Sequence, residues 1–217
     1  NDVFKAIKYM PGIESTEAFS PLVSVRGGDP GENLIMLDGV TIYNPYHSMS
    51  SGGIFNMQTV KNVDMLIGGF GAEYGGRNSS VIHISTKDGT EDGIHGEVKP
   101  STYESRVFLE FPLGEKTTAM VGARFNFDVI SNFIFGSNSY FYDGNLSITH
   151  RFNAKNRLTF KYFTSRDHVE MQFNSFYKMM GNSLSKHVDP EFGEIFNDMN
   201  LAYNNNWKNN VITAIYK

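Results

Sequence analysis

The chain has 217 residues, with 19 Lys and Arg against 23 Asp and Glu, and a formal net charge of -4. This acidic balance argues against the basic surface of a typical nucleic-acid-binding protein. The sequence has no Cys, which excludes disulfides and thiolate metal sites. It has no run of about 18 apolar residues, so it predicts no membrane-spanning helix.

Residues 1–92 are predicted to form a compact mixed α/β unit. Asp2 is placed to cap a short helix over residues 3–10, in which Val3, Phe4 and Ile7 recur at helical spacing. Four short apolar segments, flanked mostly by Gly, Asn or Asp, are predicted strands: Leu22–Val25, Leu34–Leu37, Val63–Ile67 and Val81–Ser85.

The composition changes close to residue 93. Residues 1–92 hold 8 of the 30 aromatic residues, and residues 93–217 hold the other 22. The polar run Lys87–Gly93 between them is typical of a solvated linker or turn. The sequence therefore predicts two domains, residues 1–92 and residues 93–217.

Residues 93–217 alternate between apolar and polar side chains, as strands with two different faces require. In residues 116–127, Val121, Phe125 and Phe127 fall on one face, and Arg124 and Asn126 fall on the other. We count about seven such strands. The predicted short links are Gly114–Lys116, Asn153–Asn156 and Lys208–Asn210, and the long links are Ser131–Ser139 and Met171–Asn197.

Alternating short and long links are typical of an outer-membrane β-barrel, in which antiparallel strands cross the bilayer. Aromatic residues near the strand ends suit an interfacial girdle: Tyr140, Phe141, Tyr142 and Phe163. A soluble β-sandwich also alternates and remains an alternative, although residues 116–130 are longer than a usual strand. A barrel must close with an even strand number, so we expect the chain to hold only part of one.

Four segments of the first domain resemble the plug domain of TonB-dependent outer-membrane receptors. In the family's order and spacing they read DVFKAIKYMPGI, SVRGG, NLIMLDGVTIYNP and VKNVDMLIGGFGAEYGGRNSSVIHISTKDG, and together they cover nearly all of residues 1–89. The resemblance implies a plug inside a barrel of 22 strands, and barrels of that size are plugged transporters. The chain would then contain the plug and about the first third of the barrel. No counterpart of the family's TonB box, a short segment before the plug, lies upstream of Asn1.

The resemblance also implies roles for plug residues. Plug arginines would latch the plug to glutamates of the barrel wall, which selects Arg26 and Arg77, with ordinary surface arginines as the alternative. The loop after the Asp-Gly turn would lie at the plug apex and bind ligand through Tyr43, Asn44, Tyr46 and His47. Alternatively, these residues only pack the plug against the wall.

The predicted long link Met171–Asn197 would be an external loop. Its aromatic and imidazole side chains, among them Phe176, Tyr177 and His187, are typical of an interaction surface. The segment could equally fold down as a lid or contact another subunit. None of the six His residues has a metal-binding spacing, and no nucleophile motif is present. We therefore expect no metal, cofactor, catalytic residue or enzymatic activity.

The sequence thus predicts an outer-membrane receptor of a Gram-negative cell. By resemblance, it would bind a scarce ligand at the cell surface and import it when the TonB-ExbB-ExbD complex displaces the plug. Its other partners would be outer-membrane lipid and a surface lipoprotein or other outer-membrane subunits. Two alternatives remain: a plugged barrel that serves as a structural subunit of an assembly or secretion complex, and a soluble β-rich carbohydrate binder. The ligand stays open among siderophore, vitamin, oligosaccharide and peptide.

Overall fold

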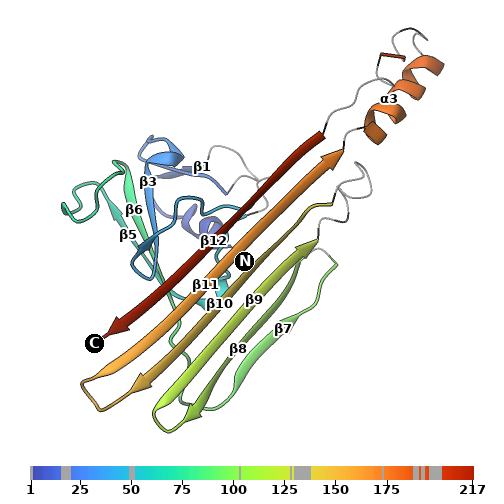
Figure 1. The fold of residues 1–217 in the computed structure, drawn as a ribbon. Coiled ribbons are helices and arrows are strands. Elements are labelled where there is room, and N and C mark those ends of the chain that lie inside the picture. Colours follow the sequence, from blue (N-terminus) through green and yellow to red (C-terminus); the bar gives the residue numbers. More distant parts are fainter. Residues whose placement is uncertain are drawn as a thin grey trace.

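The computed structural model describes residues 2–15, 21–48, 52–102, 104–127, 129, 138–172, 174–187, 191, 194–195 and 202–217. Two parts are visible in Figure 1: an N-terminal unit, residues 2–86, and a long six-stranded sheet, which we call the wall. The N-terminal unit packs on one side of the wall.

The N-terminal unit begins with helix α1 (Val3–Ile7), which Asp2 caps as predicted. The Asp2 carboxylate accepts hydrogen bonds from the backbone N–H groups of Phe4 and Lys5, at 2.8 and 3.3 Å. The helix ends before the predicted Met10, because the chain turns where the N–H of Met10 bonds the carbonyl of Ile7 at 2.9 Å.

Two small sheets complete the N-terminal unit. Strands β1 (Ile13–Ser15) and β2 (Val23–Val25) form an antiparallel pair. The second sheet has the order β4-β3-β6-β5, in which β3 and β6 are parallel. Its strands are β3 (Asn33–Leu37), β4 (Val40–Thr41), β5 (Val60–Ile67) and β6 (Ser80–Thr86), with 3-10 turns η1 (Pro30–Glu32) and η3 (Met57–Thr59) before β3 and β5. The four strands predicted from the sequence coincide with β2, β3, β5 and β6.

The wall consists of six antiparallel strands in chain order, β7 to β12. They are β7 (His95–Lys99), β8 (Glu104–Gly114), β9 (Thr117–Phe127), β10 (Tyr140–Arg151), β11 (Arg157–Gln172) and β12 (Ala202–Tyr216). Helix α3 (Asn174–His187) follows β11 and lies beyond the ends of the wall strands (Figure 1). The short links β8–β9 and β10–β11 lie at the opposite end of the strands.

The predicted turn at Lys208–Asn210 is wrong, since these residues lie inside β12. Lys208, Asn209 and Asn210 pair in register with Arg166, Ser165 and Thr164 of β11. A long neighbouring strand thus supplies backbone partners to a segment whose composition alone is typical of a turn. Because two predicted strands are one, the described residues contain six wall strands where the sequence predicted about seven.

The wall buries its polar face and exposes its apolar face. The buried side chains on the side of the N-terminal unit are largely polar: Arg124, Asn126, Asp143, Asn145, Ser147, Thr159, Lys161, Ser165 and Asp167. The opposite side exposes apolar ones: Val121, Phe125, Leu158, Phe160 and Ile212. A soluble sandwich would bury the apolar face against a second sheet, whereas a transmembrane barrel turns it toward lipid and has a polar interior.

Two residues of the predicted aromatic girdle face inward. Phe141 and Phe163 are 4% and 3% exposed. Phe163 and Val211 of the wall join the apolar core of the N-terminal unit, where Phe163 contacts the ring of Phe55. The core therefore extends across the contact and holds the unit against β11 and β12. In the described part of the chain, no helix has the length and apolarity needed to cross a membrane.

Candidate functional site

The contact between the N-terminal unit and the wall contains two buried clusters of charged groups. The first centres on His47, in the loop after β4. Backbone hydrogen bonds fix this loop, from the N–H of His47 to the carbonyl of Gly52 (2.8 Å) and from the N–H of Ile54 to the carbonyl of Pro45 (3.0 Å). The loop therefore presents the His47 imidazole to the wall in one position.

The imidazole of His47 lies between two carboxylates from neighbouring wall strands. Its Nδ1 is 3.0 Å from Asp167 Oδ2 on β11, and its Nε2 is 3.0 Å from Asp143 Oδ1 on β10. The ring stacks on Phe141 with centroids 3.7 Å apart. The His47 side chain is 0% exposed, so the wall encloses it completely.

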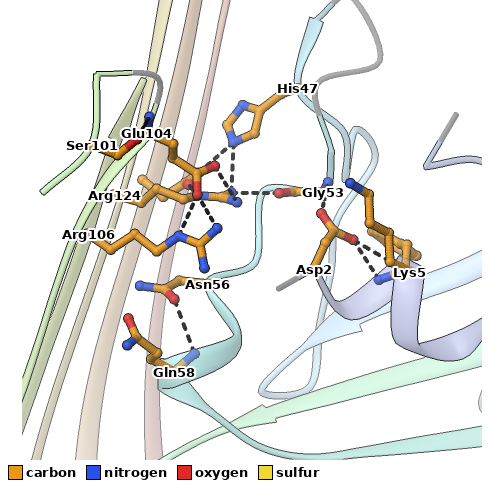
Figure 2. Close-up of polar contacts among 12 residues, drawn as sticks. Asp2, Lys5, His47, Gly53, Asn56, Gln58, Ser101, Glu104, Arg106 and Arg124 are labelled. Atoms are coloured by element: carbon orange, nitrogen blue, oxygen red, sulfur yellow. Dashed lines mark hydrogen bonds and ion pairs between the residues drawn. The ribbon is translucent and has the colours of Figure 1, made fainter. Parts of the chain in front are cut away.

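Arg124 of β9 completes this group, which we call the His47 cluster (His47, Gly53, Arg124, Asp143 and Asp167). Its Nη2 donates to the carbonyl of Gly53 at 2.6 Å and its Nε to Asp143 at 2.5 Å. Figure 2 shows Arg124 reaching from the wall to Gly53 and His47, with Glu104 and Arg106 of β8 beside it. The cluster thus joins one loop of the N-terminal unit to three wall strands.

The hydrogen bonds of the cluster are complete only when His47 is protonated. A neutral ring that accepts from Arg124 at Nε2, 3.0 Å away, leaves Asp143 Oδ1 without a donor. A protonated ring donates to Asp167 and Asp143 at once. Burial lowers the pKa of His47, but the carboxylates of Asp143 and Asp167 outweigh burial and raise this pKa above its ordinary value.

The same cluster is connected to the start of helix α1. Asp2 accepts a hydrogen bond from the N–H of Gly53 at 2.5 Å, and Gly53 in turn accepts from Arg124. Tyr46 packs on Phe4 of α1 with ring centroids 4.8 Å apart. Burial and the nearby Asp2 carboxylate raise the pKa of the Tyr46 phenol above its usual range. A displacement of Asp2 would therefore disturb Gly53 and its bond to the wall.

The second group, the Lys161 cluster, contains Asp38, Lys61, Thr86, Asp88 and Lys161. The ammonium of Lys161 on β11 is 3.0 Å from Asp38 Oδ1 and 3.0 Å from Asp88 Oδ1, and it donates to the Thr86 carbonyl at 2.7 Å. Lys61 contacts Asp88 at 3.2 Å from the solvent side. Burial raises the pKa of Asp88, but Lys161 and Lys61 outweigh it and hold this pKa below its ordinary value.

Lys161 lies nearer to the end of the wall strands that carries the short links. His47 contacts residues nearer to the end that carries α3. The N-terminal unit is therefore fixed by charge near both ends of the wall. A cavity of about 780 Å³ adjoins the Lys161 cluster and is lined by residues of both parts, among them His83, Arg157 and Ile215.

The two parts also approach closely at two glycines. A Cβ on Gly122 of β9 would lie 3.6 Å from the Cβ of Thr59 and 2.1 Å from its methyl group. Gly89, with φ +89°, crosses β9 so closely that a Cβ there would lie 2.8 Å from the Ala119 carbonyl oxygen. Gly89 therefore needs glycine for its contact with β9, whereas Gly122 leaves room for the Thr59 methyl group.

Neither arginine predicted as a latch pairs with a wall carboxylate in the described part of the chain. Arg77 donates to the carbonyl of Gly31 within the N-terminal unit. Arg26 is exposed and has φ +50°. The described ion pairs to the wall instead join His47 to Asp143 and Asp167, and join the wall cations Lys161 and Arg151 to Asp38, Asp88 and Glu91. Arg124 contacts the N-terminal unit through the carbonyl of Gly53. A latch through Arg26 or Arg77 stays a prediction for barrel residues outside this chain.

The four residues predicted at the plug apex separate into two kinds. Tyr43 is 84% exposed and Asn44 is half-buried. Tyr46 packs against α1 within the N-terminal unit, and His47 packs against the wall. Of the predicted external loop, Tyr177 and His187 lie on helix α3, where His187 Nδ1 is 3.0 Å from the Ser183 carbonyl. The backbone of Phe176 belongs to the same helix, but its side chain lies outside the described residues.

The sequence did not single out the wall residues that hold the N-terminal unit. Arg124, Asp143, Lys161 and Asp167 are charged residues on the buried side of alternating strands. An ionisable side chain at such a position is costly to bury without a partner, and that signal could have identified them. Among the described residues, no group of His, Asp and Glu is arranged to hold a metal ion.

Comparisons with known proteins agree with this architecture. The model of the TonB-dependent receptor plug domain matches residues 1–82. No curated protein matches the sequence. The siderophore receptor PirA from Pseudomonas aeruginosa is similar in structure, with a TM-score of 0.54, 19% identity, and coverage of 79% of this chain and 35% of that one.

Two further solved structures are similar over a comparable share of the chain. PirA from Acinetobacter baumannii has a TM-score of 0.57 and 18% identity, and the match covers 78% of this chain and 29% of that one. FpvA of P. aeruginosa, solved with heterologous pyoverdines, has a TM-score of 0.57 and 18% identity, with 78% and 23% covered. The chain thus spans about a third of the length of the first structures that it matches. The N-terminal unit is a TonB-dependent receptor plug domain, and the wall that follows it has the fold of the β-barrel of these outer-membrane receptors.

Proposed function

We propose that the protein to which this chain belongs is an outer-membrane transporter that imports a scarce ligand by TonB-dependent displacement of the plug. The observation that carries the proposal is the polar contact between plug and wall. It rests on two charged clusters and on hydrogen bonds, which can open and close reversibly, in addition to the apolar contact of Phe163 and Val211. We place the boundary between plug and barrel at residues 92 and 93, in the linker between β6 and β7.

The arrangement of Asp2 suggests how a pull on the plug would reach the wall. Asp2 caps α1 and also holds the N–H of Gly53, whose carbonyl accepts from Arg124. A force directed along the chain toward the N-terminus would first remove Asp2 from Gly53. The loop that carries His47 would then lose its fixed orientation, and the plug could separate from β9, β10 and β11. No covalent step is required, so we propose no catalytic residue and no cofactor.

The proposed energy source is the TonB-ExbB-ExbD complex, and outer-membrane lipid would contact the apolar face of the wall. Ferric siderophores are one ligand class to consider, because the similar solved structures include siderophore receptors. A surface lipoprotein or other outer-membrane subunits remain proposed partners. The second candidate function, a structural subunit of an outer-membrane assembly, needs the same fold but no TonB-dependent movement of the plug.

Labelling of a cysteine behind the plug distinguishes these two functions without knowledge of the ligand. Ser147 lies on the plug-facing side of β10 and is 0% exposed, and Ser147→Cys changes its size little. We would express the whole protein, free of other cysteines, in cells with and without TonB and apply a membrane-impermeant maleimide. Transport predicts labelling that requires TonB. Equal labelling in both strains would favour the structural subunit.

A further inference from the structure

One half of β12 presents a row of uncharged aromatic and amide side chains toward the plug side of the wall. Trp207 donates from Nε1 to Asp167 Oδ2 at 3.1 Å, and Asn209 donates from Nδ2 to the carbonyl of Asn44 at 3.2 Å. Both contacts are on the plug side, so the odd-numbered positions of β12 face inward. Asn205 shares this parity and donates to the Tyr203 hydroxyl at 3.1 Å.

The even-numbered positions face the other way. Asn206 contacts His168, and Asn210 contacts the hydroxyls of Tyr162 and Thr164. These three residues of β11 lie on the face opposite to the buried Phe163. Adjacent asparagines of β12 therefore lie on opposite faces of the wall. This alternation supplies matched pairs of positions for testing the inward row.

The inward row, which we call the β12 row (Tyr203, Asn205 and Trp207), begins where the plug apex ends. Asn209 joins β12 to Asn44, and Trp207 binds Asp167, which also binds His47 and the N–H of Ser48. From Asn209 the row continues toward the end of β12 nearest helix α3 (Figure 1). Tyr203 and Trp207 are 47% and 38% exposed, so both rings of the row have free surface.

The residue types of the β12 row suit a ligand with hydroxyl groups and apolar ring faces. Successive inward side chains on a strand lie about 7 Å apart, so two aromatic rings flank one amide. Rigid Tyr and Trp rings provide contact area at a low cost in conformational entropy. An Asn amide both donates and accepts hydrogen bonds, which matches the paired hydroxyl groups of a sugar.

The charge of this surface argues against an anionic ligand. The inward positions of β12 from 203 to 215 carry no ionisable cation or carboxylate, because they are Tyr, Asn, Trp, Asn, Val, Thr and Ile. The charged residue that contacts the row, Asp167, is negative and is already bonded to His47 and to the N–H of Ser48. Sites for carboxylates, phosphates and other anions normally supply Arg or Lys, and the described residues of the row and the apex supply neither.

We propose that the β12 row forms a binding site for an uncharged oligosaccharide. This inference rests on the proposed transport function and narrows its ligand class. It differs from the ligand class of the similar receptors PirA and PfeA of P. aeruginosa, which is siderophores. In the site, the rings of Tyr203 and Trp207 cover the apolar faces of sugar units, and Asn205 bonds their hydroxyl groups.

Calorimetry on the whole natural protein tests the site. The detergent should be lauryldimethylamine oxide, because a maltoside detergent would itself present a sugar. The probes are maltohexaose, cellohexaose, xylohexaose and mannohexaose, with ferric enterobactin as the anionic comparison. We expect at least one oligosaccharide to bind and ferric enterobactin not to bind.

The paired variants Asn205→Ala and Asn204→Ala then locate the binding. We expect the inward substitution Asn205→Ala, and likewise Tyr203→Ala, to weaken the oligosaccharide about tenfold, whereas the outward substitution Asn204→Ala leaves the Kd unchanged. Binding of ferric enterobactin in place of every oligosaccharide, binding of no probe, or equal effects of the two Asn substitutions would overturn the proposal. TonB-dependent labelling at Ser147→Cys would persist in those cases if transport itself is correct, so the two failures are distinguishable.

Discussion

Replacing His47 by Ala should release the plug from the wall. Removal of one partner from a buried, hydrogen-bonded charged group costs about 3–5 kcal/mol. Asp167 keeps donors in Ser48 and Trp207, and Asp143 keeps Arg124, so we expect the lower end, about 3 kcal/mol. At about 1.4 kcal/mol per factor of ten, the population of molecules with an open plug rises about 100-fold.

The assay is the rate at which a maleimide labels the Ser147→Cys reporter in the purified whole protein. The rate follows the open population when opening is fast relative to labelling. Tyr46→Phe is the matched control, because it changes the residue next to His47 and removes a buried hydroxyl without a described partner. A His47→Ala rate equal to that of the control would refute the role of His47 in holding the plug.

Three further predictions concern the His47 cluster, the Lys161 cluster and the outward face of the wall. Because the pKa of His47 is raised in the docked plug, protonation stabilises docking fully below the ordinary value of about 6.5. Each labelling rate is divided by that of the unfolded reporter at the same pH, because a thiol itself reacts faster as it ionises. This corrected rate should rise as the pH rises above that value, and His47→Gln should remove the rise. Lys161→Met should increase labelling strongly, as the side chain is 7% exposed, whereas Lys61→Met, at 55% exposure, should change it less than tenfold. Val121→Arg should reduce the amount of heat-modifiable barrel in membranes, because a charge in the middle of the lipid-facing side costs about 2–4 kcal/mol.

Each of these has a contrary result. A pH profile that is the same in His47→Gln would show that another group titrates. Equal effects of the two lysine substitutions would mean that burial of Lys161 contributes nothing to docking. Normal yield of Val121→Arg would contradict the assignment of the outward face to lipid.

Local patterns predicted much of the fold. Asp2 was identified as a helix cap because its side chain and position suffice for that role. The alternation of Val121 and Phe125 against Arg124 correctly separated the two faces of β9. Such features depend on residues close in sequence, for which periodicity is informative.

Features that depend on distant residues were not predictable in the same way. His47 and Asp167 are 120 positions apart, and no local pattern states which loop meets which strand. Phe163 was placed in the aromatic girdle near a strand end, but it lies within β11 and packs on Phe55 of the plug. His47 was predicted to bind ligand at the plug apex. Its enclosure by the wall depends on residues distant in sequence, so the local sequence does not indicate it.

A disulfide between plug and wall tests the central claim, that the plug packs on the polar face of this sheet, most directly. The chain has no Cys, and a Cβ on Gly122 would lie 3.6 Å from the Cβ of Thr59, within the range of natural disulfides. Thr149→Cys with Thr159→Cys, on paired wall positions whose hydroxyl oxygens are 3.1 Å apart, is the control within the wall. Mild oxidation of the whole protein carrying Thr59→Cys and Gly122→Cys should form the cross-link and abolish the proposed TonB-dependent import, with recovery after reduction. A folded barrel in which the control pair closes and the Thr59–Gly122 pair stays reduced would contradict the account.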